Sequence, residues 1–299
     1  MLFSERICPL LTVAGEHPKD SLELFDRLGI YSAIFTDPTV KDSPALDTKK
    51  WHVAYSCLDI LQRNETPGSI YHSLVRSDDA RYIAWLLAAL TPWTAIPLPV
   101  VKPGAKLLPP LGVNSARVGL RAETKVCNVL TGAFRHLEEI TALKDAVKNR
   151  EGYISQRDVL GMKIRNWEAM GGQWRLQALF ALLVEAMNTR DESSKWQYPL
   201  MTIECAHTYA DLEPLFGEWQ GFIEHLESMQ LMDAHSIKSI IDGKQLCKEL
   251  GGLKPGIWTG EALKVCMEWQ LRNPEAEDYA EAVEEVKRRA IELKIPLKS

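Results

Sequence analysis

Few residues in the chain have the types and spacing that metal-assisted catalysis needs. Gly68-Ser69 followed by Asp78-Asp79 loosely matches a pattern with which some enzymes hold two metal ions. That chemistry needs both carboxylates on one face of a strand, at alternate positions. The alternate positions here are Ala80 and Arg81, and the residues that follow favour a helix. We therefore predict no catalytic role for this pair.

Other catalytic and metal-binding patterns are also missing from the sequence. It has no HD dipeptide, H-E-x-x-H, G-x-S-x-G or P-loop, and none of the seven histidines has a partner at metal-ligand spacing. The six cysteines form no C-x-x-C pair, which argues against a zinc site and against a secreted disulfide framework. We expect no catalytic residue, metal or cofactor in this chain.

The stretch from 239 to 274 favours phosphate binding instead. Asp242 is a good N-cap for a first helix, and Gly251-Gly252 should end that helix. A second helix is predicted from about Thr259 to Arg272, where Asn273-Pro274 stops it. The pattern predicts two helices joined by a tight, glycine-rich turn.

Such a turn leaves backbone N–H groups unpaired beside a helix N-terminus, an arrangement that suits a phosphate. Gly256 and Gly260 frame the turn, and Lys244, Lys248 and Lys254 lie nearby. From 238 to 272 the sequence has six Lys/Arg against four Asp/Glu, although the whole chain has a net charge of −5. An ordinary hairpin with glycines for close packing is the alternative interpretation.

Two further groups of basic residues are candidates for contacts with a nucleic-acid backbone. Arg117, Arg121 and Lys125 follow each other at intervals of four, so on one helix they would form a basic stripe. Lys163 and Arg165 add positive charge to a later helix. A solvated helix face is the alternative in both cases. Phosphate contacts would position a nucleic acid without reading its sequence.

Helical periodicity extends along most of the 299 residues, and alternating β patterns are almost absent. We predict an all-α fold, a multi-helix array of elongated form with no substantial β-sheet. No apolar run approaches the ~20 residues that cross a bilayer. Neither a signal peptide nor an arginine-rich transit peptide is evident. We therefore expect no membrane association.

The hairpin sequence DGKQLCKELGGLKPGIWTGEALKVCMEWQLRNP resembles the C-terminal tail of fungal class II tRNA nucleotidyltransferases, the CCA-adding enzymes. The segment SERI at 4–7 is similar to that family's motif E, with Ser4, Glu5 and Arg6, and LFDRLGIYSAIFTDP at 24–38 resembles the stretch after it. The acidic residue that usually follows the arginine is missing, since Pro9 and Leu10 stand there.

This resemblance implies three segments. Residues 1–40 would be neck-like helices, 41–190 a helical body, and 191–299 a helical tail that carries the hairpin. The family's catalytic head, with its carboxylates, would precede motif E and is absent from this chain. The implied function is binding of the acceptor stem and T-arm of tRNA during 3′-end maturation, by shape and backbone.

The same resemblance sets expectations for chemistry and location. Mg²⁺, CTP and ATP would belong to the missing head, so this chain alone should not polymerise. Its partners would be tRNA and a catalytic head. An intracellular location in the cytoplasm, nucleus or mitochondrion is implied.

A scaffold that binds protein is the alternative function. It would be a diverged or split member of the family that docks a partner such as a separate head. Exposed tryptophans would favour it, and Trp51 and Trp258 lie outside clear core stripes.

Overall fold

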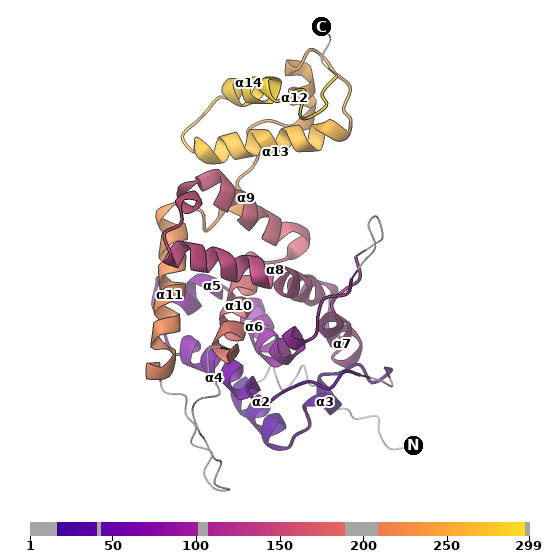
Figure 1. Cartoon of the computed structure of the whole chain (residues 1–299), viewed down its shortest axis with the longest axis vertical. Helices are drawn as coiled ribbons and strands as arrows, with labels where there is room; N and C mark the ends of the chain where they lie inside the picture. The colour runs from indigo at the N-terminus through magenta and orange to yellow at the C-terminus, as the bar shows by residue number, and fades with distance from the viewer. Residues whose placement is uncertain (1–16, 41–42, 101–106, 189–208, 297–299) are drawn as a thin grey trace. The chain divides into compact units, whose positions relative to one another are not determined.

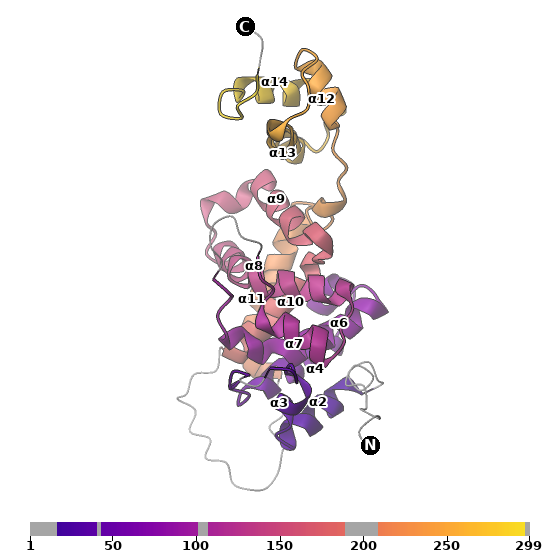
Figure 2. The ribbon, with the colours of Figure 1, turned by 90° about the vertical axis from the view of Figure 1, so that its right-hand side faces the viewer.

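The computed structural model describes residues 17–40, 43–100, 107–188 and 209–296. Within these ranges every regular element is helical and no residue lies in a β-strand (Figure 1, Figure 2). The all-α prediction is therefore confirmed. No helix in the same ranges combines the length and the apolar character that crossing a bilayer requires.

The chain divides into two compact units. The first unit comprises 1–148 and 167–223, and the second comprises 149–166 and 224–299. The residues of helices α9 and α11 are thereby shared between the units. This division rests on contacts alone, so the segments 1–40, 41–190 and 191–299 remain a prediction.

The first unit is built around α10, which is buried on nearly every side and lies against α4, α6 and α8. The run from Leu176 to Val184 is almost wholly apolar, which explains why this helix occupies the interior. The helices of this unit are α2 (Pro18–Arg27), α3 (Tyr31–Ile34), α4 (Trp51–Gln62), α5 (Ile70–Leu74), α6 (Asp78–Leu90), α7 (Leu111–Gly119), α8 (Thr124–Lys148), α10 (Trp174–Asn188) and most of α11 (Tyr209–Ser228).

Aromatic side chains fix the N-terminal helices of this unit to the end of α6. The Trp51 indole donates to the carbonyl of Ala88 at 3.0 Å, and the Tyr31 hydroxyl donates to the carbonyl of Ala89 at 2.9 Å. The two rings meet edge to face with their centroids 4.7 Å apart. These bonds satisfy buried donors and two carbonyls near the helix end.

A buried ammonium group joins α8, α10 and α11 in the first unit. Lys144 is 1% exposed, and its Nζ lies 2.7 Å from Asp145, 2.6 Å from Glu185 and 3.1 Å from Glu218. Burial alone would lower the pKa of Lys144, but its hydrogen bonds to these carboxylates outweigh burial and raise the pKa. Lys144 therefore stays charged.

The second unit contains η2 (Gly152–Ser155), most of α9 (Arg157–Glu168), η4 (Ala234–Ser236), α12 (Gly243–Glu249), α13 (Ile257–Arg272) and α14 (Ala280–Arg288). Helix α9 holds the C-terminal end of α13. Arg157 donates from Nε to the carbonyl of Met229 at 2.9 Å and from Nη1 to that of Leu271 at 2.6 Å. A Cβ on Gly161 would lie only 3.0 Å from the Leu271 side chain, so the two helices are in close contact.

The predicted hairpin is present, with α13 beginning two residues before the expected Thr259. Its core combines side chains of α12, α13, α14 and the C-terminal segment. Buried members are Ile241, Leu246, Cys247, Leu250, Trp258, Ala262, Val265, Cys266, Trp269, Ala282, Val283, Val286, Ala290 and Ile295. The C-terminal helix is thus a structural part of the hairpin, because it covers the apolar face of α13.

We expect Lys144→Met to lower the free energy of unfolding by about 3–5 kcal/mol, because it leaves Glu185 and Glu218 partly buried without their shared cation. Urea unfolding followed by circular dichroism measures this. Lys148→Met is the matched control, since Lys148 pairs with the same Glu218 but is 52% exposed. Equal and small losses for both variants would contradict a structural role for the buried ammonium.

Candidate nucleic-acid interface

Helix α12 is fixed at both of its ends, by the Asp242 cap and by two glycines. Asp242 accepts from the N–H groups of Lys244 and Gln245 at 2.8 and 2.9 Å, and the Gln245 side chain accepts from the Asp242 N–H. Gly251 and Gly252 have φ angles of +91° and +73°, which glycine adopts readily. The sequence therefore located both ends of α12 correctly.

Most N–H groups of the turn between α12 and α13 are paired, contrary to the expectation that several stay free. Those of Gly251 and Gly252 donate to the Lys248 carbonyl at 3.1 and 3.2 Å, and that of Leu253 donates to Cys247 at 3.0 Å. They close the C-terminal end of α12 in the manner of a helix C-cap. Gly251 and Gly252 therefore end α12, as predicted, and whether the turn binds a phosphate stays a prediction.

The start of α13 keeps two unpaired N–H groups. The Gly256 N–H donates to Thr259 Oγ1 at 2.9 Å, whereas those of Ile257 and Trp258 have no acceptor among the described residues. Trp258 is 8% exposed and packs into the hairpin core, so the turn is anchored. The free N–H groups that could bind an anion are therefore fewer than predicted and lie at the first residues of α13.

The three predicted lysines of the hairpin remain available to a ligand. Lys244, Lys248 and Lys254 are exposed, and their ammonium groups have no ion pair or hydrogen bond within the described ranges. Lys238, just before α12, is in the same state, although its position outside the hairpin gave no reason to single it out. The hairpin therefore carries three lysines without a partner, and a fourth, Lys238, stands just before it.

Arg165 is used differently from the prediction. Its Nη1 donates to the carbonyls of Ala234 and Ile237, both at 2.8 Å, and burial lowers its pKa. These bonds engage Nη1 in holding the turn after α11, and whether Arg165 also contacts RNA stays a prediction. Lys163, on the same helix, also interacts with other groups of the chain.

The expected basic stripe of Arg117, Arg121 and Lys125 does not exist on one helix. Arg117 lies in α7, Lys125 lies in α8, and Arg121 stands between the two helices with a φ angle of +56°. Lys125 also pairs with Asp79 at 2.7 Å. The periodicity of four crossed a helix boundary because Gly119 ends α7. Whether any of the three contacts RNA stays a prediction.

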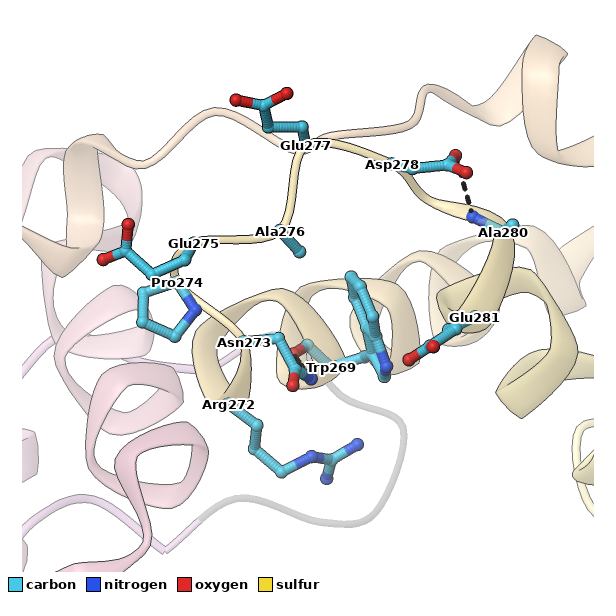
Figure 3. Close-up of a pocket in the computed structure, with 10 residues that line it drawn as sticks. All are labelled: Trp269, Arg272, Asn273, Pro274, Glu275, Ala276, Glu277, Asp278, Ala280 and Glu281. Atoms are coloured by element: carbon cyan, nitrogen blue, oxygen red, sulfur yellow. Dashed lines mark hydrogen bonds between the residues drawn. The ribbon is translucent and has the colours of Figure 1, made fainter.

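The far end of α13 carries the opposite charge. Glu275, Glu277, Asp278 and Glu281 surround a cavity of about 560 Å³, and Trp269 projects from α13 toward its loop (Figure 3). The one cation among its lining residues, Arg272, bonds Asp158 at 2.8 Å and both Glu285 oxygens at 2.6 and 2.7 Å. This end should repel a phosphate backbone.

Other candidate residues are placed as follows. Ser4, Glu5 and Arg6 lie outside the described residues. Asp78 and Asp79 form the first turn of α6, whose N-cap is Ser77. The carboxylates of Asp145, Glu185 and Glu218 lie close enough together for a metal ion, but Lys144 Nζ occupies that position.

The tryptophan argument for a protein scaffold is wrong. Trp51 is fully buried and Trp258 is 8% exposed, and every other tryptophan in the described ranges is buried as well. Both side chains serve packing, Trp51 in the first unit and Trp258 in the hairpin core.

Comparison with known proteins gives partial-length relatives. A Purpureocillium lilacinum protein named nucleotidyltransferase lcsQ is 43% identical over 296 residues, which cover 93% of this chain and 49% of that protein. The mitochondrial CCA tRNA nucleotidyltransferase of Saccharomyces cerevisiae is 36% identical over 60% of this chain and 26% of its own length. The chain is thus a relative of nucleotidyltransferases.

A third relative extends this result. The tRNA nucleotidyltransferase cca1 of Schizosaccharomyces pombe is 24% identical over 68% of this chain and 36% of its own length. This relative of nucleotidyltransferases therefore spans about half or less of the length of these curated proteins. No family model and no solved structure matches it.

We expect Gly260→Ala to raise the free energy of unfolding by about 0.5–1 kcal/mol, because Gly260 lies inside α13 and an added Cβ would meet open space. Gly256→Ala is the contrasting variant, for which we expect no such gain in the free energy of unfolding, since its Cβ would lie 3.0 Å from the Trp258 indole. Thermal unfolding measures both. Destabilisation by Gly260→Ala would contradict the helical placement of this residue.

Proposed function

We propose that this chain is the RNA-binding part of a CCA-adding tRNA nucleotidyltransferase that acts in tRNA 3′-end maturation. Its second unit would grip the tRNA backbone through the segment from Lys238 to Ile257. The observation that carries this proposal is the set of four exposed lysines that the protein itself leaves unpaired. Names of two relatives, which specify tRNA, supply the kind of RNA.

The charge distribution of the second unit supports one orientation of such an RNA. Helix α13 spans about 24 Å, with the hairpin lysines Lys244, Lys248 and Lys254 on the side of its N-terminus and the acidic loop at its C-terminus. Lys238 lies nearer the C-terminal end, because its carbonyl accepts from Gln270 Nε2 at 3.0 Å. The helix dipole adds to the same polarity. Phosphates would therefore approach the start of α13 and avoid its end.

We further propose that nucleotidyl transfer needs residues outside this chain. Asp78 and Asp79, the pair that came nearest to the required pattern, occupy a helix start, and Asp79 pairs with Lys125. The matched relatives are about twice as long or longer. Mg²⁺, CTP and ATP would then bind to a catalytic part that acts as partner to this one.

Neutralising the hairpin lysines tests the RNA proposal. The triple variant Lys244→Gln, Lys248→Gln and Lys254→Gln should weaken binding of tRNA about tenfold or more in moderate salt, because fewer counterions are released on binding. A plot of log affinity against log salt concentration should become less steep, its negative slope losing about three in magnitude. Fluorescence anisotropy over a salt series, with an unstructured RNA of equal length beside tRNA, measures this.

A control with the same loss of charge separates local contacts from overall charge. Lys19, Arg63 and Lys287 each form an ion pair with a nearby carboxylate, so their triple replacement by Gln should change tRNA affinity little. Equal affinities of the hairpin variant and the unchanged protein would contradict the proposed interface.

An incorporation assay tests the catalytic part of the proposal. The chain is mixed with tRNA lacking its 3′ CCA, radiolabelled CTP or ATP, and Mg²⁺. We expect no incorporation above background, because among the described residues the carboxylates that cluster, Asp145, Glu185 and Glu218, are already bonded to Lys144. A full-length relative under the same conditions is the positive control, and any turnover by the chain alone would refute this part.

A further inference from the structure

A groove in the second unit lies beside the free lysines. It has a volume of about 670 Å³ and runs between the first half of α13 and the segment after α14. Trp258, Val265 and Leu293 supply apolar surface, and Ile257 stands at its rim with its side chain fully exposed. All residues that line the groove belong to the second unit.

The charges that line this groove are almost all paired within the protein. Lys264 pairs with Glu261 at 2.8 Å, and Arg289 pairs with Glu268 at 3.4 Å and with Glu292 at 3.2 Å. Three cations, including Lys294, balance three carboxylates. A neutral group with apolar faces therefore fits the groove better than a phosphate does.

The residues beside the groove, in contrast, favour a phosphate. Lys254, which has no partner, is three residues from Ile257 in the sequence. Lys244 follows Gly243, where an added Cβ would lie only 3.4 Å from the Thr259 methyl group in the first turn of α13. Cations free to bind phosphate thus adjoin a slot suited to a neutral ring.

We propose that the groove holds one unpaired nucleobase of the bound RNA while the neighbouring phosphates contact the hairpin lysines. Duplex RNA keeps its bases stacked and inaccessible, so the preferred ligand would carry unpaired nucleotides in a loop or at an end. Contact of one base with the fully exposed Ile257, beside Trp258 in the groove lining, would add affinity that does not depend on which base it is. This inference rests on the proposed RNA binding by the same unit.

Ile257→Ala tests the groove without damage to the fold, since Ile257 makes no buried contact. Its matched control is Ile291→Ala, because Ile291 is 95% exposed and does not line the groove. Binding is measured by anisotropy for two RNAs of equal length and charge, a stem with unpaired nucleotides and a blunt duplex. We expect the unchanged protein and Ile291→Ala to prefer the first RNA about tenfold, roughly what burial of one exposed aliphatic side chain provides.

Ile257→Ala should reduce that preference to near unity and leave duplex affinity unchanged, whereas the triple lysine variant should weaken binding of both RNAs together. A preference that survives Ile257→Ala, or no preference in the unchanged protein, would overturn the base-binding groove and favour a protein segment as its occupant. Both results leave the lysine-dependent grip intact. If the unchanged protein bound neither RNA, the proposed function itself would be overturned.

Discussion

The second unit depends on guanidinium groups that bind backbone carbonyls. Arg157 bonds the carbonyls of Met229 and Leu271, beside the C-terminal ends of α11 and α13, and Arg165 bonds those of Ala234 and Ile237 in the turn that follows α11. Charged donors satisfy several acceptors at once, which fixes segments that have no ladder of their own. These bonds hold the C-terminal end of α13 and the segment that follows α11 in place.

The same bonds divide the cations of the second unit into two kinds. Arg157, Arg165 and Arg272 are taken up by carbonyls and carboxylates, whereas the lysines from 238 to 254 are left to solvent. A guanidinium offers five donors in a rigid fork and suits such internal bonds, while an ammonium on a flexible stem remains hydrated at the surface. Internal pairing therefore leaves these lysines, together with other exposed cations of the unit such as Arg288 and Lys294, free for an anionic partner.

Charge also differs between the two ends of α13. The lysine-bearing turn adjoins its N-terminus, and the loop with Glu275, Glu277 and Asp278 follows its C-terminus. In the first unit, by contrast, the acidic cluster is paired within the structure, where Lys144 bonds three carboxylates that would otherwise resemble a metal site. A cluster of acidic residues is thus a structural element in one unit and a repulsive surface in the other.

The sequence by itself determined the helical class, the hairpin with its Asp242 cap and its Asn273-Pro274 end, and the three lysines of its first half, because caps, breakers and periodicity act over a few neighbouring residues. Only the tertiary structure decided which polar groups are already paired. It assigned Arg165 to carbonyls and Trp51 to the core, and it split the apparent stripe from Arg117 to Lys125 between two helices. The partners of these side chains come from segments distant in the sequence, so no local pattern could reveal them.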